Sequence, residues 1–212
     1  MPVRKKQLIK PAMLGCVLLL LSAAGVGADN PKPISAAAAV ATLDSARFTA
    51  DGKLVKPQDL EQWVFVGTSL GMGYNEAQFN PASPGLFQVV QMEPRAYRYF
   101  MDNGHLAPGS MLLLSFYGTD QRVSNNKTGY VQTGLKGREI HLIDPAKQPD
   151  GRVFYSFGLK DEGTPVAPGN ECVRCHTTHG AFEGTFMQFY PVLSGRVPKA
   201  ALDKALQDKD IR

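Results

Sequence analysis

Cys172, Cys175 and His176 are the residues of this sequence whose types and spacing could do chemistry. They form the C-x-x-C-H pattern, two cysteines three positions apart with a histidine directly after the second. On a helical turn, two such sulfurs reach the two vinyl-derived carbons of one haem, and the next imidazole then lies under the iron. The pattern therefore predicts one covalently attached haem c, with Cys172 and Cys175 as the thioether residues and His176 as the axial iron ligand.

Two other uses of paired cysteines fit this sequence less well. A thioredoxin-like pair lies early in a domain, at the start of a helix in a βαβ unit. This motif instead ends 36 residues before the C-terminus of a strand-rich chain. A structural zinc site would need two further ligands, and the remaining histidines and carboxylates are scattered. Haem attachment is the favoured interpretation.

The surroundings of the iron can be predicted only in part. His179 shares the helical face of the motif, which suggests a hydrogen bond to a haem propionate or to a neighbouring ligand residue. A partly exposed helix end before Gly180 is the alternative for it. No sixth ligand is marked out among the upstream candidates, which are Met72, Met92, Met101, Met111, His105 and His141. Five-coordinate iron with an open distal face is therefore expected.

The most apolar predicted strand, 110–117, offers a distal surface. Leu112, Leu114 and Phe116 share one of its faces by the two-residue period, and this face is wholly apolar. Over a haem, such a face presents no hydrogen-bond donor and no general base, which suits a nearly neutral diatomic ligand. The alternative is that it is the core side of a central strand.

The elements that must position these residues are short. Strands are predicted at 63–68, 86–92, 110–117, 129–133, 139–143 and 152–157, and helices at 94–101, around the cysteine motif and at 182–190, where Pro191 would end the last one. The expected class is α+β, a mostly antiparallel sheet with a haem-bearing helix near the C-terminus and few other short helices.

The N-terminus predicts export. Four basic residues, Arg4, Lys5, Lys6 and Lys10, precede an apolar run at 13–26 and small residues up to Ala28. This order is typical of a secretory signal peptide at 1–28, cleaved near Ala28, and an uncleaved anchor is the alternative. A linker or loose helix at 29–46, a haem-binding domain at 47–195 and a peripheral segment at 196–212 are expected to follow. Haem attachment and export together predict a periplasmic protein.

Charge gives no argument for a polyanionic partner. Of the 23 basic residues four belong to the predicted leader, which leaves 19 against 19 acidic ones. The mature chain is therefore near neutral, so neither nucleic acid nor, after cleavage, a membrane is expected as a partner.

The chain resembles the cytochrome P-460 and cytochrome c′-beta family. The similar segments are 63–68, 94–99 with 109–112, 154–157, the haem motif, and 186–193, which contains Gln188-Phe189-Tyr190-Pro191. The resemblance implies an antiparallel sheet with the haem packed against it, five-coordinate iron and a homodimer.

The family has two branches, and the resemblance sets this chain against one of them. In the hydroxylamine-oxidising branch a strand lysine is covalently linked to the haem ring, and Leu114 stands in that place here. No lysine lies between Lys56 and Lys127. The other branch has an apolar distal pocket and is associated with nitric oxide binding.

Three functions follow, in order of preference. The first is a binding protein for nitric oxide or a related small nitrogen oxide. The second is a haem oxidoreductase acting on hydroxylamine or nitric oxide, and the third is a simple electron-transfer cytochrome. Each implies a redox partner protein.

Overall fold

The computed structural model describes residues 43–73, 80, 83–121 and 123–207. The predicted signal peptide and residues 29–42 of the predicted linker lie outside this range. Among the described residues, no helix has the length and apolar character needed to cross a membrane.

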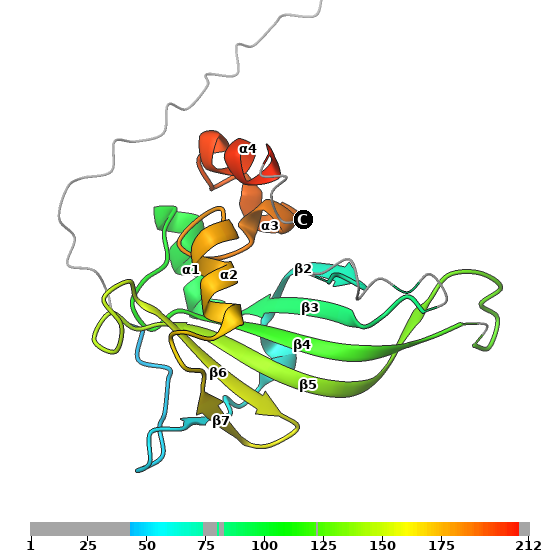
Figure 1. The fold of residues 1–212 in the computed structure, drawn as a ribbon, viewed down its shortest axis with the longest axis horizontal. Helices are drawn as coiled ribbons and strands as arrows, with labels where there is room; N and C mark the ends of the chain where they lie inside the picture. Colours follow the sequence, from blue (N-terminus) through cyan, green and yellow to red (C-terminus); the bar gives the residue numbers. More distant parts are fainter. Residues whose placement is uncertain (1–42, 74–79, 81–82, 122, 208–212) are drawn as a thin grey trace, which may run out of the picture. The chain divides into compact units, whose positions relative to one another are not determined.

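One antiparallel sheet forms the base of the described part of the chain (Figure 1). Its seven strands are β1 (Leu54–Val55), β2 (Val64–Leu70), β3 (Phe87–Met92), β4 (Met111–Asp120), β5 (Val131–Ile143), β6 (Arg152–Gly158) and β7 (Glu162–Pro165). Each strand from β2 to β7 pairs with the next one along the chain, and β1 pairs with β7 at the far edge. This arrangement confirms the predicted α+β class.

The strand register brings together side chains that are far apart in the sequence. One row across β3 to β6 contains Met92, Leu112, His141 and Phe154, and the next row contains Val90, Leu114, Glu139 and Ser156. Directly opposite residues of antiparallel strands point to the same face of the sheet. The two leucines of the predicted distal face therefore share it with a histidine and a glutamate from β5.

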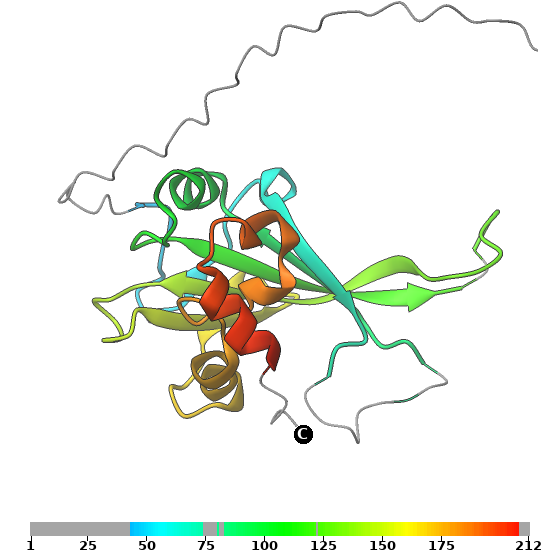
Figure 2. The same cartoon turned by 90° about the horizontal axis from the view of Figure 1, so that it is seen from above.

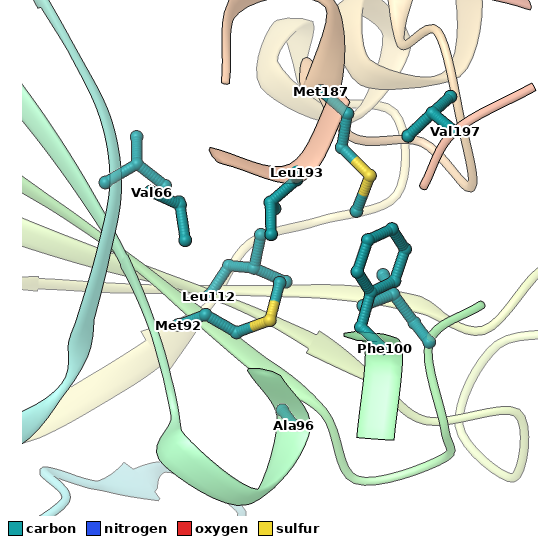
Figure 3. Close-up of a cluster of buried hydrophobic side chains, with 10 residues drawn as sticks. Val66, Met92, Ala96, Phe100, Leu112, Met187, Leu193 and Val197 are labelled. Carbon is teal, nitrogen blue, oxygen red and sulfur yellow. The ribbon is translucent and has the colours of Figure 1, made fainter. Parts of the chain in front are cut away.

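Both faces of the central strands are covered. On the helical side, Val66, Met92 and Leu112 pack with Ala96, Phe100, Met187, Leu193 and Val197 (Figure 3). A second cluster contains residues of the opposite face, among them Met111, Leu113, Ile140 and Tyr155. Burial on both faces explains why β4 is the most apolar strand of the chain.

Five of the helical segments lie over one face of the sheet (Figures 1 and 2). They are α1 (Pro94–Asn103), α2 (Glu171–His179), η3 (Met187–Phe189), α3 (Pro191–Ser194) and α4 (Lys199–Gln207). The short η1 (Leu60–Gln62) packs against the cluster of the opposite face. Helix α1 begins at Pro94, behind a Glu93 side chain that accepts hydrogen bonds from the first backbone N–H groups, and it ends at Gly104 in the left-handed conformation. The predicted helix at 94–101 is confirmed.

Two predictions about elements were wrong. The strands expected at 129–133 and 139–143 are one strand, β5, because register shifts within the β4 to β5 pairing let the ladder continue through its glycines. The helix expected at 182–190 is not continuous, and only the short 3-10 helix η3 lies within this range. Residues 182–185 form a tight turn, and Pro191 begins α3 instead of ending a helix, since proline is well tolerated in a first helical turn.

Phe100→Ala should cost about 3–5 kcal/mol of unfolding free energy, because Phe100 is fully buried and its ring packs edge-on against Phe182. Denaturant unfolding of the purified protein measures this. Phe65→Ala is the matched control, since half of Phe65 is exposed and the same atoms are removed. Equal costs for the two variants would contradict the described core.

Candidate functional site

Helix α2 carries the cysteine motif. The Asn170 side chain caps it by accepting from the backbone N–H of Cys172 at 2.9 Å. Cys172 is exposed, Cys175 is half-buried, and both are free thiols. The predicted helix around the motif is therefore confirmed, and its two sulfurs are available for attachment.

The electrostatics of the thiols speak against a thioredoxin-like pair. Burial, followed by the nearby Glu139, raises the pKa of Cys172. Burial also raises the pKa of Cys175, and the charges of Cys172 and Glu171 add to it. A redox-active pair depends on a lowered thiol pKa, so the shift has the wrong direction for that chemistry.

His176 is held in one orientation by the backbone. Its Nδ1 lies 2.8 Å from the carbonyl oxygen of Gly184. A carbonyl only accepts hydrogen bonds, so Nδ1 must carry the proton and Nε2 keeps its lone pair. A metal-binding histidine requires such an unprotonated ring nitrogen, while a hydrogen bond from the other nitrogen fixes the orientation of the ring.

The turn that supplies this carbonyl is itself fixed. Phe182 and Thr185 close it with two backbone hydrogen bonds, and its central residues, Glu183 and Gly184, have φ angles of 47° and 66°. Positive φ at both central positions is the pattern of a type I′ turn, for which glycine is favoured. The Glu183 carboxylate also accepts the backbone N–H of Leu106 at 2.7 Å, which ties the turn to the segment after α1.

Aromatic rings surround His176. The centroids of Phe186 and Phe154 lie 4.6 Å and 4.7 Å from the imidazole, and that of His141 lies 5.6 Å away, edge-on. His141 is itself buried and stacked on Phe154, and none of the described residues offers a hydrogen-bond partner to its Nε2. Burial, the neighbouring His176 and Arg152 lower the pKa of His141 well below its ordinary value, so this ring is neutral.

Gln188 joins the end of α2 to the chain that follows it. Its amide donates to the carbonyl of His179 at 3.0 Å and accepts from the backbone N–H of Ala181 at 3.2 Å. Two residues on, Tyr190 passes so close to β2 that a Cβ on Gly67 would lie 2.8 Å from its ring. Glycine at position 67 thus permits the close approach of this segment to the sheet.

A cleft opens between these elements. Its volume is about 720 Å³, open solvent at its mouth included, and His176 lines it together with apolar residues such as Val90, Leu112, Leu114, Phe154, Phe186 and Phe189. Cofactor sites are typically concave and lined mostly by apolar side chains, with a few polar groups among them. The lining of the cleft therefore has the character of a cofactor site.

Glu139 is a site residue that the sequence analysis missed. It lines the cleft directly opposite Leu114, and burial raises its pKa. The strand face of Leu112 and Leu114 is apolar as expected, but the cleft as a whole is not. Glu139 reaches the cleft because β5 pairs with β4. The residue pattern within a single strand does not reveal which strand it pairs with.

The other predicted residues lie as follows. Phe116 is on the same strand but not among the residues that line the cleft. The backbone carbonyl of His179 is bonded to Gln188, and a contact of its ring with a propionate stays a prediction. Of the six upstream candidates for a sixth ligand, Met72 and His141 line the cleft.

The residues fit a haem. Two free thiols and His176 share the helix at the cleft, the imidazole has Nδ1 bonded and Nε2 available, and the buried Nε2 of His141 lacks a protein partner. In the described part of the chain no group of three or more His, Cys, Asp or Glu side chains could hold a metal ion. A haem iron needs no such group, since the porphyrin supplies four of its ligands.

Comparison with known families agrees with this geometry. Residues 57–187 match the family model described as Cytochrome P460. The match includes the motif, the turn at 182–185 and every strand from β2 to β7. None of the curated proteins matches the chain.

Gly184→Ala should destabilise the protein by about 1–3 kcal/mol and alter its haem spectrum. Its φ of +66° is strained for alanine, and the new Cβ would lie 2.1 Å from Cδ of Arg152. Denaturant unfolding and an optical spectrum measure the two effects. The control, Gly195→Ala, adds a methyl group where nothing lies within 4 Å and φ is −66°, so it should be neutral or slightly stabilising. A neutral Gly184→Ala would contradict the described turn.

Proposed function

The chain belongs to the cytochrome P460 family, and from this premise we propose that it is an exported c-type monohaem protein that binds nitric oxide or a related small nitrogen oxide. Membership in the family implies a haem protein of nitrogen-oxide metabolism. In the proposal Cys172 and Cys175 attach the haem, and His176 is the axial ligand. One observation carries it: the oriented imidazole of His176 opens onto a largely apolar cleft.

The apolar part of the cleft supports a diatomic ligand. Nitric oxide is small and nearly neutral, so it needs no hydrogen-bond donor to enter a site lined by Val90, Leu112 and Leu114. Charged or strongly hydrated molecules would lose their water there without compensation. The bound haem supplies an iron centre for the gas, and these side chains exclude water from it.

The remaining parts of the proposal rest on the sequence. The signal peptide at 1–28 places the protein in the periplasm, where a redox partner protein would set the oxidation state of the haem. A homodimer follows from the family resemblance.

The haem assignment predicts distinct spectra. The optical spectrum of the purified ferrous protein should be that of a high-spin haem and should shift when nitric oxide is added. The spectrum of a sample denatured in pyridine should report two thioether bonds. Cys172→Ala should report one, and His176→Ala should lose the axial ligand and the native spectrum. His105→Ala is the control, because His105 contacts Tyr99 outside the cleft. Two thioether bonds in Cys172→Ala would contradict the attachment.

A low-spin spectrum indifferent to the gas would contradict the open site and favour electron transfer, with Met72 or His141 as sixth ligand.

Hydroxylamine oxidation is the second candidate, and Glu139 is the observation that favours it. A carboxylate in the cleft can accept protons from a bound substrate, and burial moves its pKa upwards from its ordinary range towards neutrality. Leu114 opposes this candidate, because a leucine cannot form the ring cross-link that the resemblance associates with the enzymatic branch.

If the protein oxidises hydroxylamine, Glu139→Gln should lower the rate by about 10²–10⁴-fold, since a general base contributes that much. The wild-type rate should rise with pH as the carboxyl ionises through its raised pKa, and the glutamine variant should lose this dependence. Reduction of a soluble electron acceptor measures the rate. Glu171→Gln removes the same charge from an exposed position and should leave the rate unchanged. A wild-type protein that shows no hydroxylamine-dependent reduction would remove this candidate.

A further inference from the structure

Arg152 is a largely buried cation beside the turn that holds His176. It is the first residue of β6, and its guanidinium donates to the Asp150 carboxylate at 2.7 Å. The other oxygen of the same carboxylate accepts the backbone N–H of Arg152 at 3.0 Å. Only 18% of the Arg152 side chain is exposed, so water screens its charge weakly.

The stem of this side chain packs against the turn that orients the proximal imidazole. A Cβ on Gly184 would lie 2.1 Å from Cδ and 3.0 Å from Nε of Arg152, so the stem contacts the glycine directly. The carbonyl of that glycine accepts the Nδ1 proton of His176. One residue therefore separates Arg152 from the imidazole.

The charge of Arg152 lies close to the imidazole in a poorly hydrated part of the fold. Its stem contacts Gly184, whose carbonyl bonds His176, and only 18% of the side chain is exposed. Its guanidinium therefore contributes a positive field at the imidazole that water screens weakly.

We infer that Arg152 is a positioning and charge-tuning residue for the iron site: its stem holds the Gly184 carbonyl in place, and its guanidinium, balanced by Asp150, raises the reduction potential of an iron bound to His176. The inference rests on the proposed haem attachment. On reduction, ferric iron gains one electron from the redox partner and the site loses one unit of positive charge. A fixed cation nearby favours this change, and a fixed anion opposes it.

The consequence concerns the ligand. Nitric oxide accepts electron density from iron into its antibonding orbitals, and ferrous iron supplies more of it than ferric iron. A cation that favours reduction would therefore increase the fraction of the protein in the ferrous state, which is the state that binds the gas more tightly.

The experiment measures the midpoint potential of the purified holoprotein by optical redox titration. Arg152→Met keeps an unbranched stem against Gly184 but removes the charge, so the potential should fall. Asp150→Asn keeps a hydrogen-bond acceptor but removes the counter-charge, so the potential should rise. Arg152→Lys keeps a charge and should lie between Arg152→Met and the wild type. Shifts of opposite sign are not expected from structural damage alone.

Arg98→Met is the matched control, because it removes the same charge from an exposed position on α1, outside the cleft. Its potential should shift less than that of Arg152→Met. The iron–histidine stretching vibration of the ferrous protein gives a second readout. It should stay near the wild-type frequency in Arg152→Met and shift in Arg152→Ala, which also removes the stem.

The outcomes are separable from those of the haem assignment. A wild-type pyridine spectrum without two thioether bonds would contradict the proposed function itself. With two bonds present, equal potentials in the wild type and Arg152→Met would overturn the inference, and so would a shift of the same size in Arg98→Met. If Arg152→Met does not fold, Asp150→Asn decides alone, and a potential that fails to rise would overturn the inference.

Discussion

The hydrogen bond from His176 to the Gly184 carbonyl is the interaction on which the site depends. It fixes the tautomer of the imidazole, and a tight turn with two positive φ angles holds its acceptor. Contacts from two distant parts of the fold reach this turn: the backbone N–H of Leu106 and the Arg152 stem at the start of β6. The ring of Phe186, which directly follows the turn, packs against the imidazole. A motif of five residues therefore becomes a site only where distant segments converge on one carbonyl.

The sheet contributes through its register. Leu112 faces His141, and Leu114 faces Glu139, because β4 and β5 pair in one alignment. A slip by one residue would turn these leucines away from the cleft and bring Leu113 into it. The second cluster on the opposite face, which includes Leu113 and Ile140, resists such a slip, since it would lose its own buried residues at the same time. Packing on the opposite face thus fixes the strand register, and the register decides which side chains line the cleft.

Much of the local structure could be predicted from local patterns. The alternation in β4, the proline start and glycine end of α1, and the helix around Cys172 all depend on neighbouring residues, and the structure has them. Contacts between distant segments could not be predicted in this way. Glu139 and His141 enter the cleft through strand pairing, and nothing within their own strand indicates it. The helix expected at 182–190 failed for a related reason. Its apolar residues suggested a continuous helix, but Glu183 and Gly184 turn the chain so that a carbonyl meets His176.

Two charges of opposite sign near the cleft set the chemical character of this chain. Glu139 is partly buried, which raises its pKa, and none of the ion pairs found among the described residues includes it. Arg152 lies beside the turn that holds the imidazole and shares its charge with Asp150. In an apolar environment both charges act more strongly than they would in water. In the proposed site the Glu139 carboxyl could accept a proton, whereas Leu114, directly opposite, cannot form the ring cross-link that the resemblance associates with the enzymatic branch. These two residues therefore support different candidate functions, which is why the proposal for binding and the candidate for turnover need separate tests.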